Sequence, residues 1–385
     1  MTSRWSRSLR TRVPRTFGRT VGRIGSLALL VALVAVVLTP APAHAHGIGG
    51  IRPSNYETRV LSVRPTTRGV EVTAVDLGDR LELRNTPGAD VTVLGYDDEP
   101  YLRVGPRGVF ENRRSPAVYL NRTRTAASPV PERADPKATP EWRRIGDGTT
   151  VRWHDHRTHW MGRTDPPAVR ADPGVVHQVQ PFVVKLRQGA ETIRVTGDVR
   201  WIPGPAPWPW IGLALLLALV VVMLSRTRFA VAAVGVTLVV VAVSEAAHIV
   251  GGWGGTTVGA GTKLAASVYA VGGIVVSVLA LVWLLRRGLD AAAPLVLVAG
   301  LFLALAGGLA DVTVLTRSQL PTTLPDSAAR LVVSLALGLG LGLAGAGALR
   351  LRRQRRPQQR RPQQRPGGAS PGATAPGDPV APAPS

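Results

Sequence analysis

Long apolar segments in the second half of the chain constrain its fold more than any other feature. Each approaches or exceeds the ~20 residues that an α-helix needs to cross the hydrocarbon core of a bilayer. The sequence therefore predicts an α-helical bundle of five transmembrane helices within residues 204–350. The predicted spans are Trp208–Ser225, Phe229–Val250, Leu264–Leu285, Ala291–Leu315 and Leu331–Leu349. The last span contains Gly338 and Gly342 in a G-x-x-x-G spacing, which predicts close helix packing within the bundle.

Basic residues predict how these helices are oriented. Arginines follow the first, third and fifth spans, and the loops at the opposite ends of the helices contain fewer basic residues. The arginines after these three spans are Arg226, Arg228, Arg286, Arg287, Arg350, Arg352 and Arg353. Short basic loops stay in the cytoplasm. We therefore expect a multi-pass plasma-membrane protein with the bilayer as its principal partner. Residues 46–207 would lie outside the cytoplasm. Residues 351–385 would form a disordered basic, Pro-rich tail inside it.

The N-terminus has the order of parts found in a secretory signal. Arginines precede the apolar run Ile24–Leu38, and small residues with two A-x-A sites follow it. This order predicts a cleaved signal peptide over residues 1–45, with an uncleaved signal anchor as the alternative. Cleavage after Ala43 would leave His44 first, and cleavage after Ala45, which we favour, would leave His46 first.

Charge and composition exclude several classes of function. The formal net charge is +22, but much of the excess lies in the two terminal regions, which fits membrane topology better than a nucleic-acid-binding face. The chain has no cysteine, which excludes disulfides, thiolate zinc sites, iron–sulfur clusters and a cysteine nucleophile. It also lacks G-x-S-x-G, H-E-x-x-H and nucleotide-binding motifs. We therefore predict a protein that is not an enzyme and does not bind nucleic acid.

Residues 46–203 have the pattern of an all-β domain. Short alternating segments are separated by turn sequences, which favours an exported two-sheet sandwich of immunoglobulin or cupredoxin type. Predicted strands are Thr58–Arg64, Val70–Val75, Arg80–Arg84, Asp90–Leu94 and Tyr101–Val104, with a hairpin of Phe182–Leu186 and Thr192–Trp201. The Pro-rich stretches Ser128–Pro140 and Thr164–Pro173 are predicted to be ordered loops or inserts.

One histidine-rich segment carries the candidate chemistry of this domain. The sequence from Trp153 to Met161 is W-H-D-H-R-T-H-W-M, and a strand would place His154 and His156 on one face. Imidazoles suit Cu(II), Zn(II) and Ni(II). An N-terminal His46 would add an α-amine and a further imidazole. The candidate Cu(II) ligands are therefore His46, His154, His156, His159 and Met161.

A structural network is the alternative explanation of this segment. In that case Asp155, Arg157 and Arg163 would hydrogen-bond the histidines, and Trp153 and Trp160 would be core aromatics. The metal hypothesis needs exposed imidazoles that face a common point, whereas the network needs a buried and fully bonded segment.

The order of parts resembles that of copper-resistance proteins, in which a periplasmic copper-binding sandwich beginning with histidine is fused to a membrane bundle. The matching features are Ala43–His46, the H-x-H at His154 and His156, and the following bundle. The resemblance implies copper handling by the exported domain. An N-terminal histidine copper site also resembles that of polysaccharide monooxygenases, which leaves oxidation as a minor alternative. The phrases Glu99–Arg103, Asn112–Pro116 and Tyr119–Asn121 resemble uncharacterised actinobacterial membrane proteins with an exported β-domain, which imply no function.

Two acidic residues and one histidine lie among the polar residues of the apolar spans. Glu245 and His248 are three residues apart and share a helix face, and Asp311 lies toward the outer end of the fourth span. Ionisable groups within spans often mark functional sites, so these three could pass a metal ion or a proton. In the alternative, Glu245 pairs with Lys263 and Asp311 lies at the membrane interface.

Together these features predict a membrane-anchored extracytoplasmic module that binds copper or another divalent metal. One alternative is a non-catalytic cell-envelope interaction module. The other is an accessory subunit that works with another envelope or membrane protein.

Overall fold

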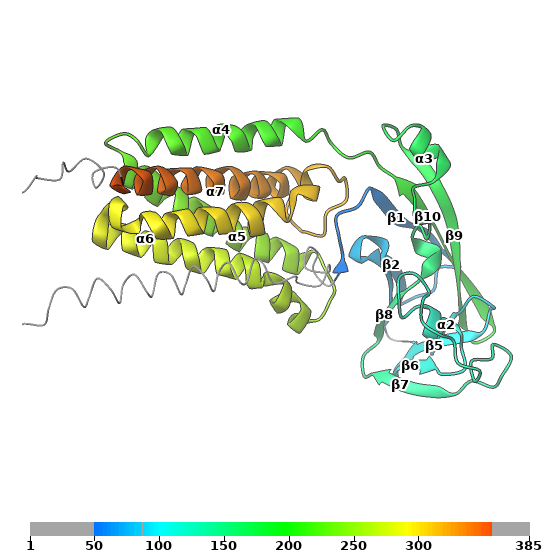
Figure 1. The fold of residues 1–385 in the computed structure, drawn as a ribbon. Coiled ribbons are helices and arrows are strands. Elements are labelled where there is room, and N and C mark those ends of the chain that lie inside the picture. Colours follow the sequence, from blue (N-terminus) through cyan, green and yellow to red (C-terminus); the bar gives the residue numbers. More distant parts are fainter. Residues whose placement is uncertain (1–49, 87, 356–385) are drawn as a thin grey trace, which may run out of the picture.

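The computed structural model describes residues 50–86 and 88–355. An antiparallel β-sheet domain is followed by a bundle of helices, with the two parts placed end to end (Figure 1). The predicted signal peptide, His44, His46 and most of the predicted tail lie outside the described residues.

The β-domain contains two antiparallel sheets. The larger, seven-stranded sheet has the order β1-β10-β9-β4-β5-β6-β7, and the smaller, three-stranded sheet has the order β2-β3-β8. The larger sheet comprises β1 (Tyr56–Arg64), β10 (Glu191–Trp201), β9 (His177–Gln188), β4 (Val91–Leu94), β5 (Pro100–Gly105), β6 (Gly108–Asn112) and β7 (Trp142–Gly146). The smaller sheet comprises β2 (Val70–Val75), β3 (Arg80–Asn85) and β8 (Thr150–His154).

One hydrophobic core joins the two sheets. Leu81 and Leu83 of β3 belong to the same buried cluster as Val184 and Leu186 of β9. Alternation produces this arrangement, because successive side chains of a strand point to opposite faces. The predicted antiparallel β-domain is confirmed, and its assignment to an immunoglobulin or cupredoxin type stays a prediction.

Strand prediction succeeded where alternation was clear and failed at one side of the larger sheet. The predicted hairpin is present as β9 and β10, which pair from Gln188 opposite Glu191. Strands β6 and β7 were not predicted. Strand β7 lies at the edge of the sheet, and its residues are exposed or half-buried, so it lacks an apolar alternation. The second Pro-rich stretch contains the short helix α3 (Pro167–Ala171).

The bundle is built from α4 (Trp208–Leu224), α5 (Ala230–Gly254), α6 (Ala260–Phe302) and α7 (Asp326–Arg355). Within the described residues, three helices are long and apolar enough to cross a membrane: α5, α7, and α6 with its extension to Leu309. Helix α4 is apolar but shorter, with 17 residues.

Helix α6 folds back on itself at Gly288. That residue has φ 75°, a conformation that favours glycine. A Cβ built on Gly272 would lie 3.1 Å from the Phe302 ring, so the two halves of α6 lie side by side. The break falls between the predicted spans Leu264–Leu285 and Ala291–Leu315. After Phe302 the chain continues as the π-helix η4 (Leu303–Leu309) and the 3-10 helix η5 (Val312–Leu315).

The β-domain is bonded to the loops at one end of the bundle. Ser54 and Gln319 form a two-way backbone pair, with N···O distances of 3.0 and 2.8 Å. Asp76 accepts hydrogen bonds from the backbone N (2.7 Å) and Oγ1 (2.6 Å) of Thr257, in the loop between α5 and α6. The C-terminus of α7 lies at the opposite end (Figure 1), where Gln354 Nε2 donates to the carbonyl of Asp290, two residues after the break in α6.

Candidate metal centre

The histidine segment crosses from strand β8 into a single helical turn. His154 ends β8, where it pairs with Arg80 of β3. Asp155 is the N-cap of the 3-10 helix η3 (His156–Thr158), and its carboxylate accepts the backbone N–H of Arg157. Capping by Asp satisfies an amide that the short helix cannot bond internally. The chain therefore turns sharply after β8 and returns His159 toward His154.

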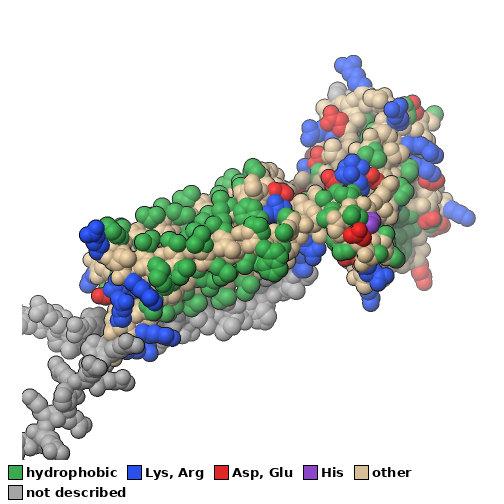
Figure 2. Space-filling view, turned by 90° about the horizontal axis from the view of Figure 1, so that it is seen from above, with side chains coloured by type: hydrophobic (Ala, Val, Ile, Leu, Met, Phe, Trp, Pro, Cys, Tyr) green, Lys and Arg blue, Asp and Glu red, His purple; other side chains and the backbone are tan. Residues whose placement is uncertain are grey.

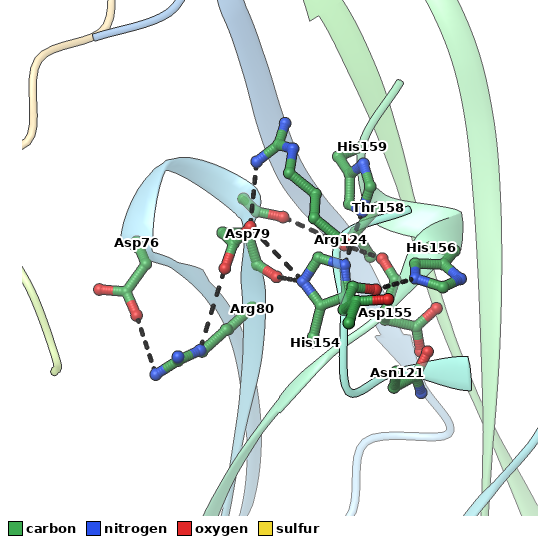
Figure 3. Close-up of polar contacts among 12 residues, drawn as sticks. Asp76, Asp79, Arg80, Asn121, Arg124, His154, Asp155, His156, Thr158 and His159 are labelled. Carbon is green, nitrogen blue, oxygen red and sulfur yellow. Dashed lines mark hydrogen bonds and ion pairs between the residues drawn. The ribbon is translucent and has the colours of Figure 1, made fainter. Parts of the chain in front are cut away.

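The three imidazoles form one cluster. One ring nitrogen from each of His154, His156 and His159 lies within 4.8 Å of those of the other two. The Nε2 atoms of His154 and His159 are 2.9 Å apart. Figure 3 shows the three rings grouped beside Asp79 and Arg124. His159 is buried, with 4% of its surface exposed, the His154 side chain is only 10% exposed, and His156 is half-buried.

Backbone carbonyls set which ring nitrogens carry protons. The Asp79 carbonyl lies 2.6 Å from His154 Nδ1, and the Thr123 carbonyl lies 2.9 Å from His156 Nε2. A carbonyl oxygen only accepts, so these nitrogens donate, and the other nitrogen of each neutral ring carries a lone pair. Metal-binding histidines usually donate their second nitrogen to a carbonyl or carboxylate in this way.

The close pair of nitrogens requires a cation or a proton between them. His154 Nε2 carries a lone pair because Nδ1 donates to Asp79. Its neighbour His159 Nε2, 2.9 Å away, either donates a proton or shares a bound cation with it. Two ligands at right angles on a metal with bonds of ~2.0 Å lie about 2.9 Å apart. His156 can bind the same ion through Nδ1, or through Nε2 after releasing Thr123.

The surroundings keep the cluster ready for a metal at neutral pH. Burial, together with the positive charge of Arg124, lowers the pKa of His159 to about 4. This ring is therefore neutral at pH 7, as a metal ligand must be. Burial opposes ionisation of Asp79, but the hydrogen bond from His154 and the charge of Arg124 hold the pKa of that carboxyl below its ordinary value.

Asp155 and Arg157 form a separate network under the cluster. The buried Asp155 carboxylate accepts from Trp153 Nε1 at 3.0 Å and from Arg157 Nη2 at 2.7 Å. These two charged residues bond each other rather than the imidazoles, so that part of the predicted network is wrong. Trp153 is buried in the core, as the network alternative predicted.

Two predicted ligands are not placed against the cluster. Met161 follows η3, and its side chain is 41% exposed rather than buried with His159. His46 lies outside the described residues. No sequence pattern marks Asp79, Thr123 or Arg124, because two of them act through backbone carbonyls and all three come from distant segments.

The predicted membrane cluster is brought together at the junction with the β-domain. His248 Nε2 lies 3.5 Å from Asp311 Oδ2, and Glu245 lines the same cavity. The alternative pairing of Glu245 with Lys263 is wrong, because Lys263 Nζ donates to the carbonyl of Trp253 at 2.6 Å.

Comparison with known proteins identifies no relative of this chain: no family model, no curated protein and no solved structure matches it. The resemblance to copper-resistance proteins therefore stays a prediction, and the site is judged on its own geometry.

Proposed function

We propose that this protein is a membrane-anchored module whose exported β-domain binds one Cu(II) ion through His154, His156 and His159. The observation that carries the proposal is the 2.9 Å approach of two imidazole nitrogens, one of which has its second nitrogen on a backbone carbonyl. Cu(II) is the preferred divalent ion of nitrogen ligands in the Irving–Williams order.

The distribution of arginines supports an exported β-domain. Lys and Arg side chains gather at the end of the bundle that faces away from the β-domain, whereas the visible flank of the bundle is hydrophobic (Figure 2). Arg350 joins the ends of three helices there, with Nη2 3.3 Å from the Ser225 carbonyl and Nη1 3.4 Å from Asp290. Arg- and Lys-rich ends of transmembrane helices remain on the cytoplasmic side of the membrane, which would leave the β-domain on the other side. With α4 and both halves of α6 as spans, the bundle crosses the membrane five times.

His46 is the proposed fourth ligand. Cleavage after Ala45 would give it both an α-amine and an imidazole, and Met161 would supply only a weak thioether. An extra N-terminal alanine displaces this amine without touching the three internal histidines.

A metal-free interaction module is the second candidate function. Strand β7 favours it, because an exposed edge strand offers unpaired backbone groups to another envelope or membrane protein.

A copper titration of the full-length protein in detergent distinguishes these functions. We expect an electron paramagnetic resonance spectrum with coupling to several nitrogens, and its loss in the His154→Ala and His159→Ala variants. The His177→Ala variant is the matched control, because His177 bonds the Asp172 carbonyl away from the cluster. The same copper spectrum in wild type and in a His154→Ala/His159→Ala protein would refute copper binding at the cluster.

A further inference from the structure

A cavity of ≈ 100 Å³ lies where the bundle meets the β-domain. Pro53, just before β1, and Leu320 to Thr322, between η5 and α7, form part of its wall. The remaining lining comes from α5, the first half of α6, the π-helix η4 with the turn and η5 that follow it, and the first turns of α7. Its ionisable side chains are Glu245, His248 and Asp311.

Glu245 is buried without a matching donor. Only 3% of its surface is exposed, and its Oε1 has no hydrogen-bond partner among the described residues. An ionised carboxylate in an apolar bundle is costly unless a cation or a hydrogen bond compensates it. A cation bound at this oxygen would supply the compensation that the protein itself does not provide.

The wall facing Glu245 is made by an irregular helix. A Cβ on Gly307, within η4, would lie 2.6 Å from Glu245 Oε1, so glycine leaves the space that this carboxylate occupies. Short π-helical insertions are rare and frequently occur at functional sites. The close approach of Gly307 to Glu245 and the π-helical geometry of η4 are therefore two observations that do not depend on the charges of Glu245 and Asp311.

The other two polar groups supply a mixed ligand set. His248 lies three residues after Glu245 on α5, and its Nε2 is 3.5 Å from Asp311 Oδ2. Glu245 and Asp311 are close enough to interact electrostatically. Imidazole nitrogen and carboxylate oxygen are both ligands of divalent metals such as Zn(II), and two carboxylates would neutralise the charge of the ion.

We propose that Glu245, His248 and Asp311 form a second divalent-metal site, at the junction of the bundle and the β-domain. It shares no ligand with the histidine cluster of the β-domain and does not depend on it. Zn(II) suits both ligand sets and serves as the probe for both.

Zinc binding by the full-length protein in detergent tests the second site. We expect about two tightly bound Zn(II) ions per wild-type chain and one in a His154→Ala/His159→Ala background. Adding Glu245→Gln or His248→Gln to that background should weaken the remaining site by about 100-fold or more, beyond the loss expected from an outer-sphere change. Asp290→Asn is the matched control, because this carboxylate lies at the opposite end of the bundle, beside Arg350.

The outcomes separate the two sites. A background protein that binds no Zn(II), or that binds it equally well after Glu245→Gln, would overturn the second site. If the histidine cluster does not bind metal, the Glu245→Gln protein with intact histidines binds no Zn(II), because its second site has been removed. X-ray absorption of the Zn-loaded background protein is the second measurement, since it needs no change in the bundle. Mixed nitrogen and oxygen coordination is expected, and coordination by imidazole alone would refute this ligand set.

Discussion

His159 links the candidate metal centre to pH. Burial and the charge of Arg124 lower its pKa from 6.5 to about 4. Between these values the unfolded chain binds more protons at this position than the folded protein does. Stability therefore rises with pH through this window and is lost as the pH falls from about 6.5 toward 4.

We predict that replacing His159 weakens this pH dependence. In the metal-free wild type, lowering the pH from 7 to 4.5 should remove on the order of 2 kcal/mol of unfolding free energy through this residue. The His159→Gln protein should lose correspondingly less. Denaturant unfolding followed by tryptophan fluorescence at both pH values gives the comparison, and His177→Gln is the control. If the unfolding free energy of the His159→Gln and His177→Gln proteins fell equally between pH 7 and 4.5, the lowered pKa of His159 would not be the cause of the pH dependence.

Local spacing predicted the three histidines but not their surroundings. His154, His156 and His159 lie within six consecutive residues, so the turn after a strand is enough to group them. Asp79 and Thr123 reach the rings through backbone carbonyls, a group that almost any residue offers. Only the pairing of β3 with β8 brings Asp79 there, and sequence alternation does not specify which strands pair.

Two faces of helix α7 carry glycines for two different neighbours. Gly338 and Gly342 lie against Ala214 and Val221 of α4, whereas Gly340 lies against Ala304 of the π-helix η4. Small residues let helix backbones approach closely in a membrane. The packing role predicted for the G-x-x-x-G spacing is confirmed, and α4 is the partner helix.

We predict that Gly338→Ala destabilises the contact between α4 and α7. Its Cβ would overlap the backbone of Ala214, so α4 must move, at a cost of about 1–3 kcal/mol. The melting temperature of the detergent-solubilised protein should fall. Gly212→Ala on α4 is the matched control, because nothing lies within 4 Å of a Cβ there. An equal melting temperature for both variants would contradict this packing.

The elements that the sequence missed lack a periodic signal. Strand β7 has no buried residue, so no apolar alternation identifies it. The π-helix η4 is composed of Leu, Ala and Gly, like an ordinary transmembrane segment, and no residue type distinguishes its wider turn. By contrast, β2 and β10 have clear alternation and were predicted close to their observed bounds, whereas β9 begins five residues before its predicted start.

At the scale of the whole molecule, Thr257 joins the β-domain to the bundle. Its backbone N–H and hydroxyl both donate to Asp76, whose side chain is fully buried.

We predict that Thr257→Val lowers the unfolding free energy by about 1.5–3 kcal/mol, because it leaves one oxygen of a buried carboxylate without the hydroxyl donor. Hydrogen exchange in residues 255–260 should become faster. Thr227→Val, at the other end of the bundle, should leave that exchange unchanged, and a similar rise in both variants would refute the prediction.

The orientation of the whole chain can be measured directly because it contains no cysteine. We predict that a membrane-impermeant maleimide labels an Asp147→Cys protein on intact cells, since this side chain is exposed in the β-domain. A Gln354→Cys protein, at the end of α7, should react only after permeabilisation. Labelling of Gln354→Cys on intact cells would place the basic end outside and contradict an exported β-domain.

The pairing of Ser54 with Gln319 has a consequence for protein engineering. The loop before α7 also donates from Ser318 to the Ile202 carbonyl at 2.8 Å and to Asn55 Oδ1 at 3.0 Å. The β-domain is therefore completed by a segment that follows it by more than a hundred residues. A graft onto another anchor that ends at the predicted boundary, residue 203, would leave these backbone groups without their partners. A portable version of this domain should carry residues 316–320 as an added peptide, making the loop part of the transplanted unit.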